Sequence, residues 1–271
     1  MSRGDTFGAI GGSGVFTDRP TITYTPLTGD KFLRGLISPI PVKSVLLMLQ
    51  SGYPADFVLS WTVESLSGLR NRPTVPGLAR AAQPEFDRAL TLMRDIQIDG
   101  GVNLGIEGAT AKDETTVVVF RAADLPESTR EKSVELRRLL GLSTRQQRFR
   151  VVSSSGRGDD GQLALQPRSM FQVMLAVGLY VEVPPEHLTQ HWAVPGARMD
   201  AATNAASPAA IHCSKEKPPD AYAAVEYKDY WFFVDQNDPR TKRVLAFLTL
   251  LFTLTDMGNT GNLPVLTIPT S

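Results

Sequence analysis

The spacing of apolar residues follows two periods along this chain, the helical period near 3.6 and the two-residue period of strands. Helical spacing, in most cases opening at a proline, covers 30–37, 41–50, 54–69, 84–98, 127–140, 168–181 and 239–255. Strand-like alternation or β-branched runs cover 21–25, 102–106, 115–121, 147–154, 162–166, 223–235 and 264–269. The helices from 41 and 54 follow each other directly and predict a helical hairpin.

Two of the strand-like stretches predict β-hairpins. Residues 147–154 and 162–166 flank the Gly-rich stretch 156–161, which favours a reversal of the chain. Residues 223–235 turn at Lys228-Asp229, a tip that would place Tyr227 opposite Tyr230 and Val225 opposite Phe232.

The last long helix has a clear start signal. Asp238 stands at the N-cap position and Pro239 at the first helical position. Its most apolar part, 244–254, has 11 residues, whereas a bilayer-spanning helix needs about 20. We therefore predict no transmembrane helix.

Hairpin-connected strands and runs of helices predict an α+β fold, with antiparallel hairpins packed on helices. The Gly-rich residues 1–18 are expected to be a flexible lead-in to a single domain over 19–271. Residues 186–222 carry little periodic signal and predict a surface excursion.

The strand 230–235 is apolar on both faces. Phe232 and Val234 alternate with Trp231 and Phe233, and the helix from Pro239 can cover one face. If the helical hairpin 41–69 covers the other, the strand belongs to a plain core. If nothing covers it, Tyr230, Trp231 and Phe233 form a docking patch for a protein partner.

Composition narrows the class of partner. The 271 residues balance 28 Lys and Arg against 28 Asp and Glu, so no overall field favours nucleic acid, and no nucleic-acid-reading motif is present. The sequence predicts no cofactor, because the Gly-rich 8–14 lacks the flanking elements of a phosphate-binding loop. Peripheral membrane association stays open.

One cluster suggests metal chemistry. His187 and His191 are spaced i and i+4, and His212 and Cys213, the single cysteine, lie in the same segment. The four residues could be zinc ligands, but the Glu of a metalloprotease H-E-x-x-H is missing. Solvated loop histidines are the alternative interpretation.

Six phrases resemble a family of uncharacterised Gram-negative bacterial proteins described as lipoproteins. They are RPTITYTPLTG (19–29), LQSGYPAD (49–56), SLSGLRNR (65–72), VEVPPEH (181–187), YKDYWFFVDQND (227–238) and LFTLTDMGNTGNLPVLTIP (251–269). The resemblance implies an envelope location and carries over no site residue.

Together these patterns predict a non-enzymatic cell-envelope protein that acts as an interaction or assembly component. The alternatives are a metal-dependent hydrolase using His187, His191 and His212, or a cytoplasmic small-molecule-binding domain. The expected compartment is the periplasm or the inner face of the outer membrane if a signal segment has been removed. It is the cytoplasm if these 271 residues are the full native chain.

Overall fold

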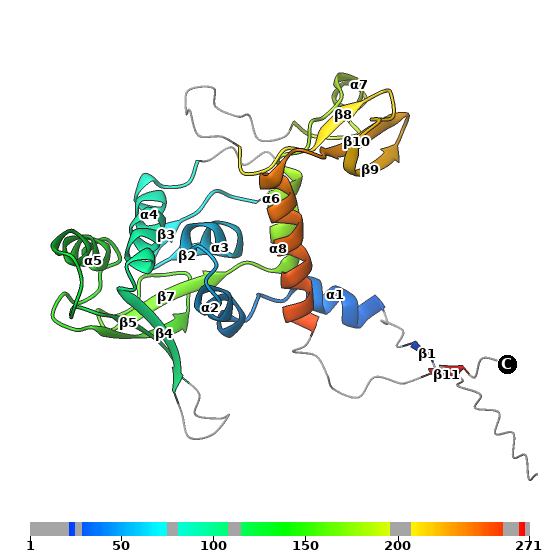
Figure 1. Ribbon diagram of the computed structural model, residues 1–271. Helices are drawn as coiled ribbons and strands as arrows, with labels where there is room; N and C mark the ends of the chain where they lie inside the picture. The colour runs from blue at the N-terminus through cyan, green and yellow to red at the C-terminus, as the bar shows by residue number, and fades with distance from the viewer. Residues whose placement is uncertain are drawn as a thin grey trace, which may run out of the picture.

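In the computed structural model the protein has an α+β fold, as the sequence predicts (Figure 1). The described residues are 22–24, 29–74, 81–107, 115–195, 207–256 and 266–268, so the expected lead-in at 1–18 lies outside them. The helices are α1 (Gly29–Ile37), α2 (Val42–Gln50), α3 (Ala55–Thr62), α4 (Pro84–Ile98), α5 (Glu127–Leu139), α6 (Met170–Gly178), α7 (Pro185–Thr189) and α8 (Pro239–Asp256). The strands are β1 (Ile22–Tyr24), β2 (Val63–Leu66), β3 (Leu69–Arg70), β4 (Val102–Glu107), β5 (Thr115–Phe120), β6 (Arg148–Ser153), β7 (Gln162–Pro167), β8 (His212–Ser214), β9 (Ala221–Tyr227), β10 (Tyr230–Asp235) and β11 (Leu266–Ile268).

The largest sheet has six strands in the order β3-β2-β7-β6-β5-β4. Its neighbours are antiparallel except for β6 and β7, which run parallel with Arg150 opposite Gln162. The predicted hairpin over 147–166 is therefore wrong. The eight residues 154–161 carry the chain back to the start of β6. Strand β7 then runs parallel to β6 on one side and pairs antiparallel with β2 on the other.

A layer of helices covers this sheet. Helix α3 packs on α2 and α4, and α4 packs on α5. Sheet residues such as Phe120 and Phe149, whose rings meet at 5.8 Å, share the core with Phe86 and Leu136 of the helices. On β6, Phe149 and Val151 are buried while Arg148 and Arg150 point outward, as expected for a strand with one solvated face.

The helix predicted over 54–69 ends at Thr62, where the chain continues as β2. The Thr62 hydroxyl bonds the Val58 carbonyl within the last turn, and from Val63 the backbone pairs with β7 instead. Trp61 and Val58 are buried, as their spacing predicts, and Phe57 is half-buried.

Gly141 ends α5 as the sequence predicts. It has φ of 69°, the left-handed region that favours glycine, and the Leu142 amide donates to the Arg137 carbonyl. The Gly141 amide donates to Arg138, which completes a Schellman motif.

Helix α8 buries one stripe of side chains, Thr241, Val244, Phe247 and Leu251. Asp238 caps its first turn by accepting hydrogen bonds from the amides of Arg240 at 2.9 Å and Thr241 at 3.2 Å. The predicted cap is thus confirmed.

A second sheet, β8-β10-β9, forms with α7 what we call the small lobe. Figure 1 shows it at the N-terminal end of α8, away from the six-stranded sheet. The predicted excursion 186–222 thus contains regular structure in α7 and β8, while 196–206 lies outside the described residues. Near the ends of the described chain, β1 pairs with β11.

Candidate functional site

The small lobe holds the site residues that the sequence singled out, except His191, which lies just after its helix α7. The predicted hairpin register is confirmed, with Tyr227 opposite Tyr230 and Val225 opposite Phe232. Lys228 and Asp229 at the tip have φ of 49° and 63°, as a tight two-residue turn requires. Strand β8 pairs on the other side of β10.

One face of this small sheet lies against α7. Tyr230 and Val234 are buried there, and Phe232 is half-buried. Four aromatic rings surround the buried imidazole of His187 at centroid distances of 5.2 to 6.3 Å, those of Trp192, Tyr227, Tyr230 and Phe232. Its Nε2 atom is buried without a hydrogen-bond partner among the described residues. The predicted ligand His187 is therefore packed as an aromatic core residue of the lobe.

The opposite face carries Trp231 and Phe233, both half-buried. The helical hairpin 41–69, one of the two expected covers, does not lie on this face, since α2 and α3 pack in the main body (Figure 1). The Lys217 ammonium lies 5.1 Å from the Trp231 ring centre, and the His212 ring lies 5.7 Å from Phe233. Two large aromatic side chains thus remain partly open to solvent.

Strand β9 is the edge of the sheet, and every residue from 222 to 227 is exposed. Val225 is 67% exposed and Tyr227 57% exposed, high values for apolar side chains on a strand. Within this strand the single charge is Glu226. An edge so poor in charge is the kind that pairs readily with another strand.

Lysine side chains lie over the aromatic rings of the lobe. Lys228 is 3.6 Å from the Trp192 ring centre, and Lys242 is 4.8 Å from that of Tyr222. Lys215 lies 5.5 Å from the Tyr230 ring centre and 3.0 Å from Glu186. Hydrogen bonds from Lys215 and Tyr230 lower the pKa of the Glu186 carboxyl. The surface combines apolar area with cations, which favours a partner that offers both apolar and acidic groups.

The predicted metal ligands are not assembled into a metal site. His212 and Cys213 are adjacent on β8, so their side chains point to opposite faces of the sheet. His212 is held by Glu182 at 2.8 Å, and burial, aided by Glu182, raises the pKa of the Cys213 thiol. His191 follows the end of α7 with φ of 55°. Among the described residues no group of three or more His, Cys, Asp or Glu side chains is arranged to hold a metal ion.

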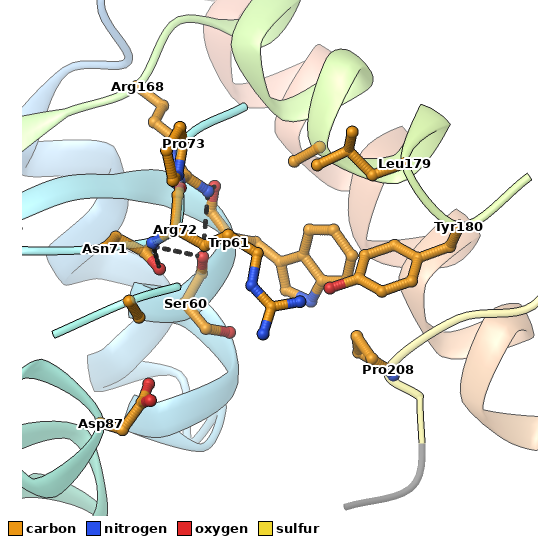
Figure 2. A pocket seen from close by; sticks show the side chains of 12 residues that line it. Ser60, Trp61, Asn71, Arg72, Pro73, Asp87, Arg168, Leu179, Tyr180 and Pro208 are labelled. Atoms are coloured by element: carbon orange, nitrogen blue, oxygen red, sulfur yellow. Dashed lines mark hydrogen bonds between the residues drawn. The ribbon is translucent and has the colours of Figure 1, made fainter. Parts of the chain in front are cut away.

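A pocket that the sequence did not reveal lies between α3, α4 and α6 (Figure 2). Its volume is about 180 Å³. Apolar walls come from Trp61 and Tyr180, whose rings meet edge-on at 5.9 Å, and from Leu179 and Pro208. Figure 2 shows Asp87 on one side of the pocket, Tyr180 on the other and the Arg72 guanidinium between them in this view.

Buried polar side chains fix the floor of this pocket. Arg168 donates to Glu64 at 3.0 Å, to the Ser60 carbonyl at 3.2 Å and to the Arg72 carbonyl. Burial lowers the pKa of the Arg168 guanidinium, although Glu64 acts in the opposite direction. Asn71 donates to the Ser60 carbonyl at 2.8 Å and accepts from the Arg72 amide. These bonds satisfy carbonyls at the end of α3 and hold the backbone of Arg72 in place.

Sequence reasoning missed the pocket because its parts are distant in the chain. Arg168 and Glu64 are 104 residues apart, and neither belongs to a motif that marks a site. The signal available in the sequence was the polar Asn71-Arg72 step directly after β3, and such a step is too common to identify a site by itself.

Comparison of the chain with protein-family models, curated protein sequences and solved structures gives no match. In the described part of the chain, no helix has the length and apolar character required to cross a membrane.

Proposed function

We propose that this protein is a non-enzymatic interaction component of the cell envelope, and that it docks an extended segment of a partner protein on the edge of β9. The observation that carries the proposal is the exposure of every residue from 222 to 227 on a sheet edge that pairs with none of the described strands. The addition of a strand to such an edge is a common way to bind an extended segment, because main-chain hydrogen bonds supply affinity without a deep pocket.

The hairpin register identifies the backbone groups that are free. In a two-residue hairpin, the residues that flank the turn bond each other, so Tyr227 and Val225 direct their backbone groups to β10. Ala224 and Glu226 then direct theirs outward, up to the register shift at Tyr222. A docked strand would form backbone hydrogen bonds with these two residues, and its own side chains would lie beside the two faces of the sheet.

Side chains on both faces of the small sheet would contact such a strand and so select its sequence. On the outer face Trp231 and Phe233 are partly open, and on the α7 face Val225 and Tyr227 are exposed. Lys217 beside Trp231 provides a cation for an acidic residue of the partner.

A second exposed apolar surface supports a role in assembly. Helices α1 and α6 contact each other. Their exposed large apolar side chains are Phe32, Leu33, Ile37, Phe171 and Met174. Apolar groups gathered in this way are typical of interaction sites. The envelope location is supported by the six phrases that resemble Gram-negative lipoproteins.

Site-specific photo-crosslinking in the native cells tests the proposal. A photoreactive residue replaces Glu226 on the β9 edge, and a matched one replaces Glu131, an exposed residue of α5. We expect a discrete adduct with one other protein from position 226 and none from position 131.

The backbone contribution is tested with two substitutions at Ala224. Ala224→Pro removes an outward amide and leaves the bonds to β10, so the adduct at 226 should disappear while the lobe stays folded. Ala224→Val keeps the amide and should keep the adduct. If the proline variant retains the adduct, if 131 reacts equally, or if the adduct is a second copy of this chain, the proposal is wrong.

A further inference from the structure

The pocket beside Trp61 continues into a second hollow, and the two form one groove. The second hollow has a volume of about 370 Å³ and reaches Arg94 on α4 and Arg243 on α8. Both hollows are lined by Ser60, Trp61, Asp87 and Pro208. Asp87 therefore lies in the middle of the groove, with Arg72 in the first hollow and Arg243 in the second.

Most polar groups of the groove are already engaged. Arg94 pairs with Asp56 at 2.7 Å, Arg168 pairs with Glu64, and the Ser60 hydroxyl donates to the Phe57 carbonyl at 2.9 Å. These contacts make the walls rigid.

Three charged side chains of the groove are not engaged in this way. Among the described residues, Arg72, Asp87 and Arg243 make neither an ion pair nor a side-chain hydrogen bond. They lie at the rim, partly exposed to solvent, around walls that combine apolar side chains such as Trp61 and Leu90 with the engaged polar groups. A few polar groups that converge on a concave surface are the usual arrangement of a small-molecule site.

Arg72 and Asp87 both line the first hollow, and Figure 2 shows the Arg72 guanidinium between Asp87 and Tyr180 in this view. They form no ion pair with each other, and Arg72 lowers the pKa of Asp87, although burial raises it more. A guanidinium and a carboxylate that line one hollow without pairing can both be met by one head group that carries both charges.

We propose that the groove binds an α-amino acid, with its carboxylate on Arg72, its ammonium on Asp87 and its side chain in the second hollow. Arg72 offers the planar fork that suits a carboxylate, and Asp87 accepts from the ammonium. Trp61 forms part of the wall of both hollows and excludes water from one side of the ligand. Arg243 lies where the ligand side chain ends, so an acidic side chain is preferred. This site does not depend on the docking proposed for β9.

Isothermal calorimetry on the full chain tests the assignment with three probes, L-glutamate, L-lysine and glutarate. We expect glutamate to bind with a dissociation constant below about 1 mM, or roughly 4 kcal/mol of binding free energy. Lysine should bind at least about tenfold more weakly, because the ammonium of its side chain is repelled by the Arg243 guanidinium. Glutarate should also bind more weakly than glutamate, because it lacks the α-ammonium that Asp87 would accept. Absence of binding by all three up to about 10 mM would overturn the proposal.

Variants assign each contact. Arg72→Gln should weaken glutamate binding about tenfold or more, and Arg243→Gln should reduce the preference for glutamate over lysine. Asp87→Asn should weaken glutamate binding and leave glutarate binding unchanged or stronger. The matched control Glu131→Gln on α5 should change nothing. Equal affinities in Arg72→Gln and the unmodified protein would contradict the site even if glutamate bound, because binding would then lie elsewhere.

Discussion

Phe247 of α8 packs edge-on against Phe57 of α3, with the ring centroids 5.0 Å apart and the ring planes at 67°. Tyr53 adds a third ring at 6.0 Å from Phe247. This contact packs α8 against the hairpin of α2 and α3, so α8 belongs to the same hydrophobic core as the helices of the main body.

Truncation of this contact should destabilise the protein. Phe247 is 1% exposed, and Phe247→Ala should lower the free energy of unfolding by about 3 to 5 kcal/mol. Urea denaturation followed by circular dichroism measures the change. Thr249→Ala, on the exposed stripe of the same helix, should remain within about 0.5 kcal/mol of the unmodified protein. Equal effects of the two changes would show that α8 does not depend on this contact.

Arg168 should be irreplaceable, even by another cation. Its side chain is 3% exposed and joins Glu64 to three backbone carbonyls. Arg168→Met leaves the half-buried Glu64 carboxylate unpaired and should cost about 3 to 5 kcal/mol in unfolding free energy. Arg168→Lys should recover a minor part, since one ammonium cannot reach all four acceptors. Recovery of full stability by lysine, measured by the same denaturation, would contradict this network.

The cap of α8 predicts a specific dependence of stability on pH. The Thr241 hydroxyl, followed by the amides of Thr241 and Arg240, lowers the pKa of Asp238 from its usual 3.8. Because the folded state has the lower pKa, the cap stabilises at neutral pH, and the effect disappears as pH falls below about 4 through the folded value.

Comparison of Asp238→Ala with the unmodified protein measures this effect. The variant should lose about 1 kcal/mol at pH 7, and the difference should shrink as pH falls toward 3. Asp238→Asn should retain most of the cap and show little pH dependence. A difference that stayed constant with pH would mean that the charge of Asp238 does not contribute.

The buried Nε2 atom of His187, which has no hydrogen-bond partner among the described residues, should be a cost to the small lobe. His187→Phe removes the buried Nε2 atom while it keeps a ring among the four aromatic neighbours, so stability should stay equal or rise by about 1 kcal/mol. His187→Ala should instead cost about 2 to 4 kcal/mol through the cavity that it leaves. The near-ultraviolet circular dichroism melt reports on these rings. A phenylalanine variant as unstable as the alanine one would show that His187 makes a polar contact in solution.

The elements that sequence reasoning predicted correctly are those with local causes. The Lys228-Asp229 turn fixes the register of β9 and β10, Gly141 ends α5, and Asp238 starts α8. Each depends on a backbone conformation or a hydrogen bond within a few residues.

The errors have non-local causes. The apolar residues of 63–69 stand at 63, 66 and 69, a spacing that suits a helix. The pairing with β7, about 100 residues later, decides for the strand. The parallel pairing of β6 and β7 depends on the same distant partner, because β7 bridges β6 and β2. The groove depends on Arg72, Asp87 and Arg243, which come from three separate parts of the chain. The period of apolar residues contains no information on such juxtapositions.

Because β7 pairs with β2, this part of the six-stranded sheet can form only after both strands have been synthesised. The Arg168–Glu64 contact closes a loop of 104 residues, so β2 leaves the ribosome long before its partner strand exists. At about 5 to 20 residues per second, that interval lasts roughly 5 to 20 s. During this time β2 can pair only with the short strand β3 that follows it, and its edge toward β7 stays open. That open edge is a natural contact for a chaperone acting on the growing chain.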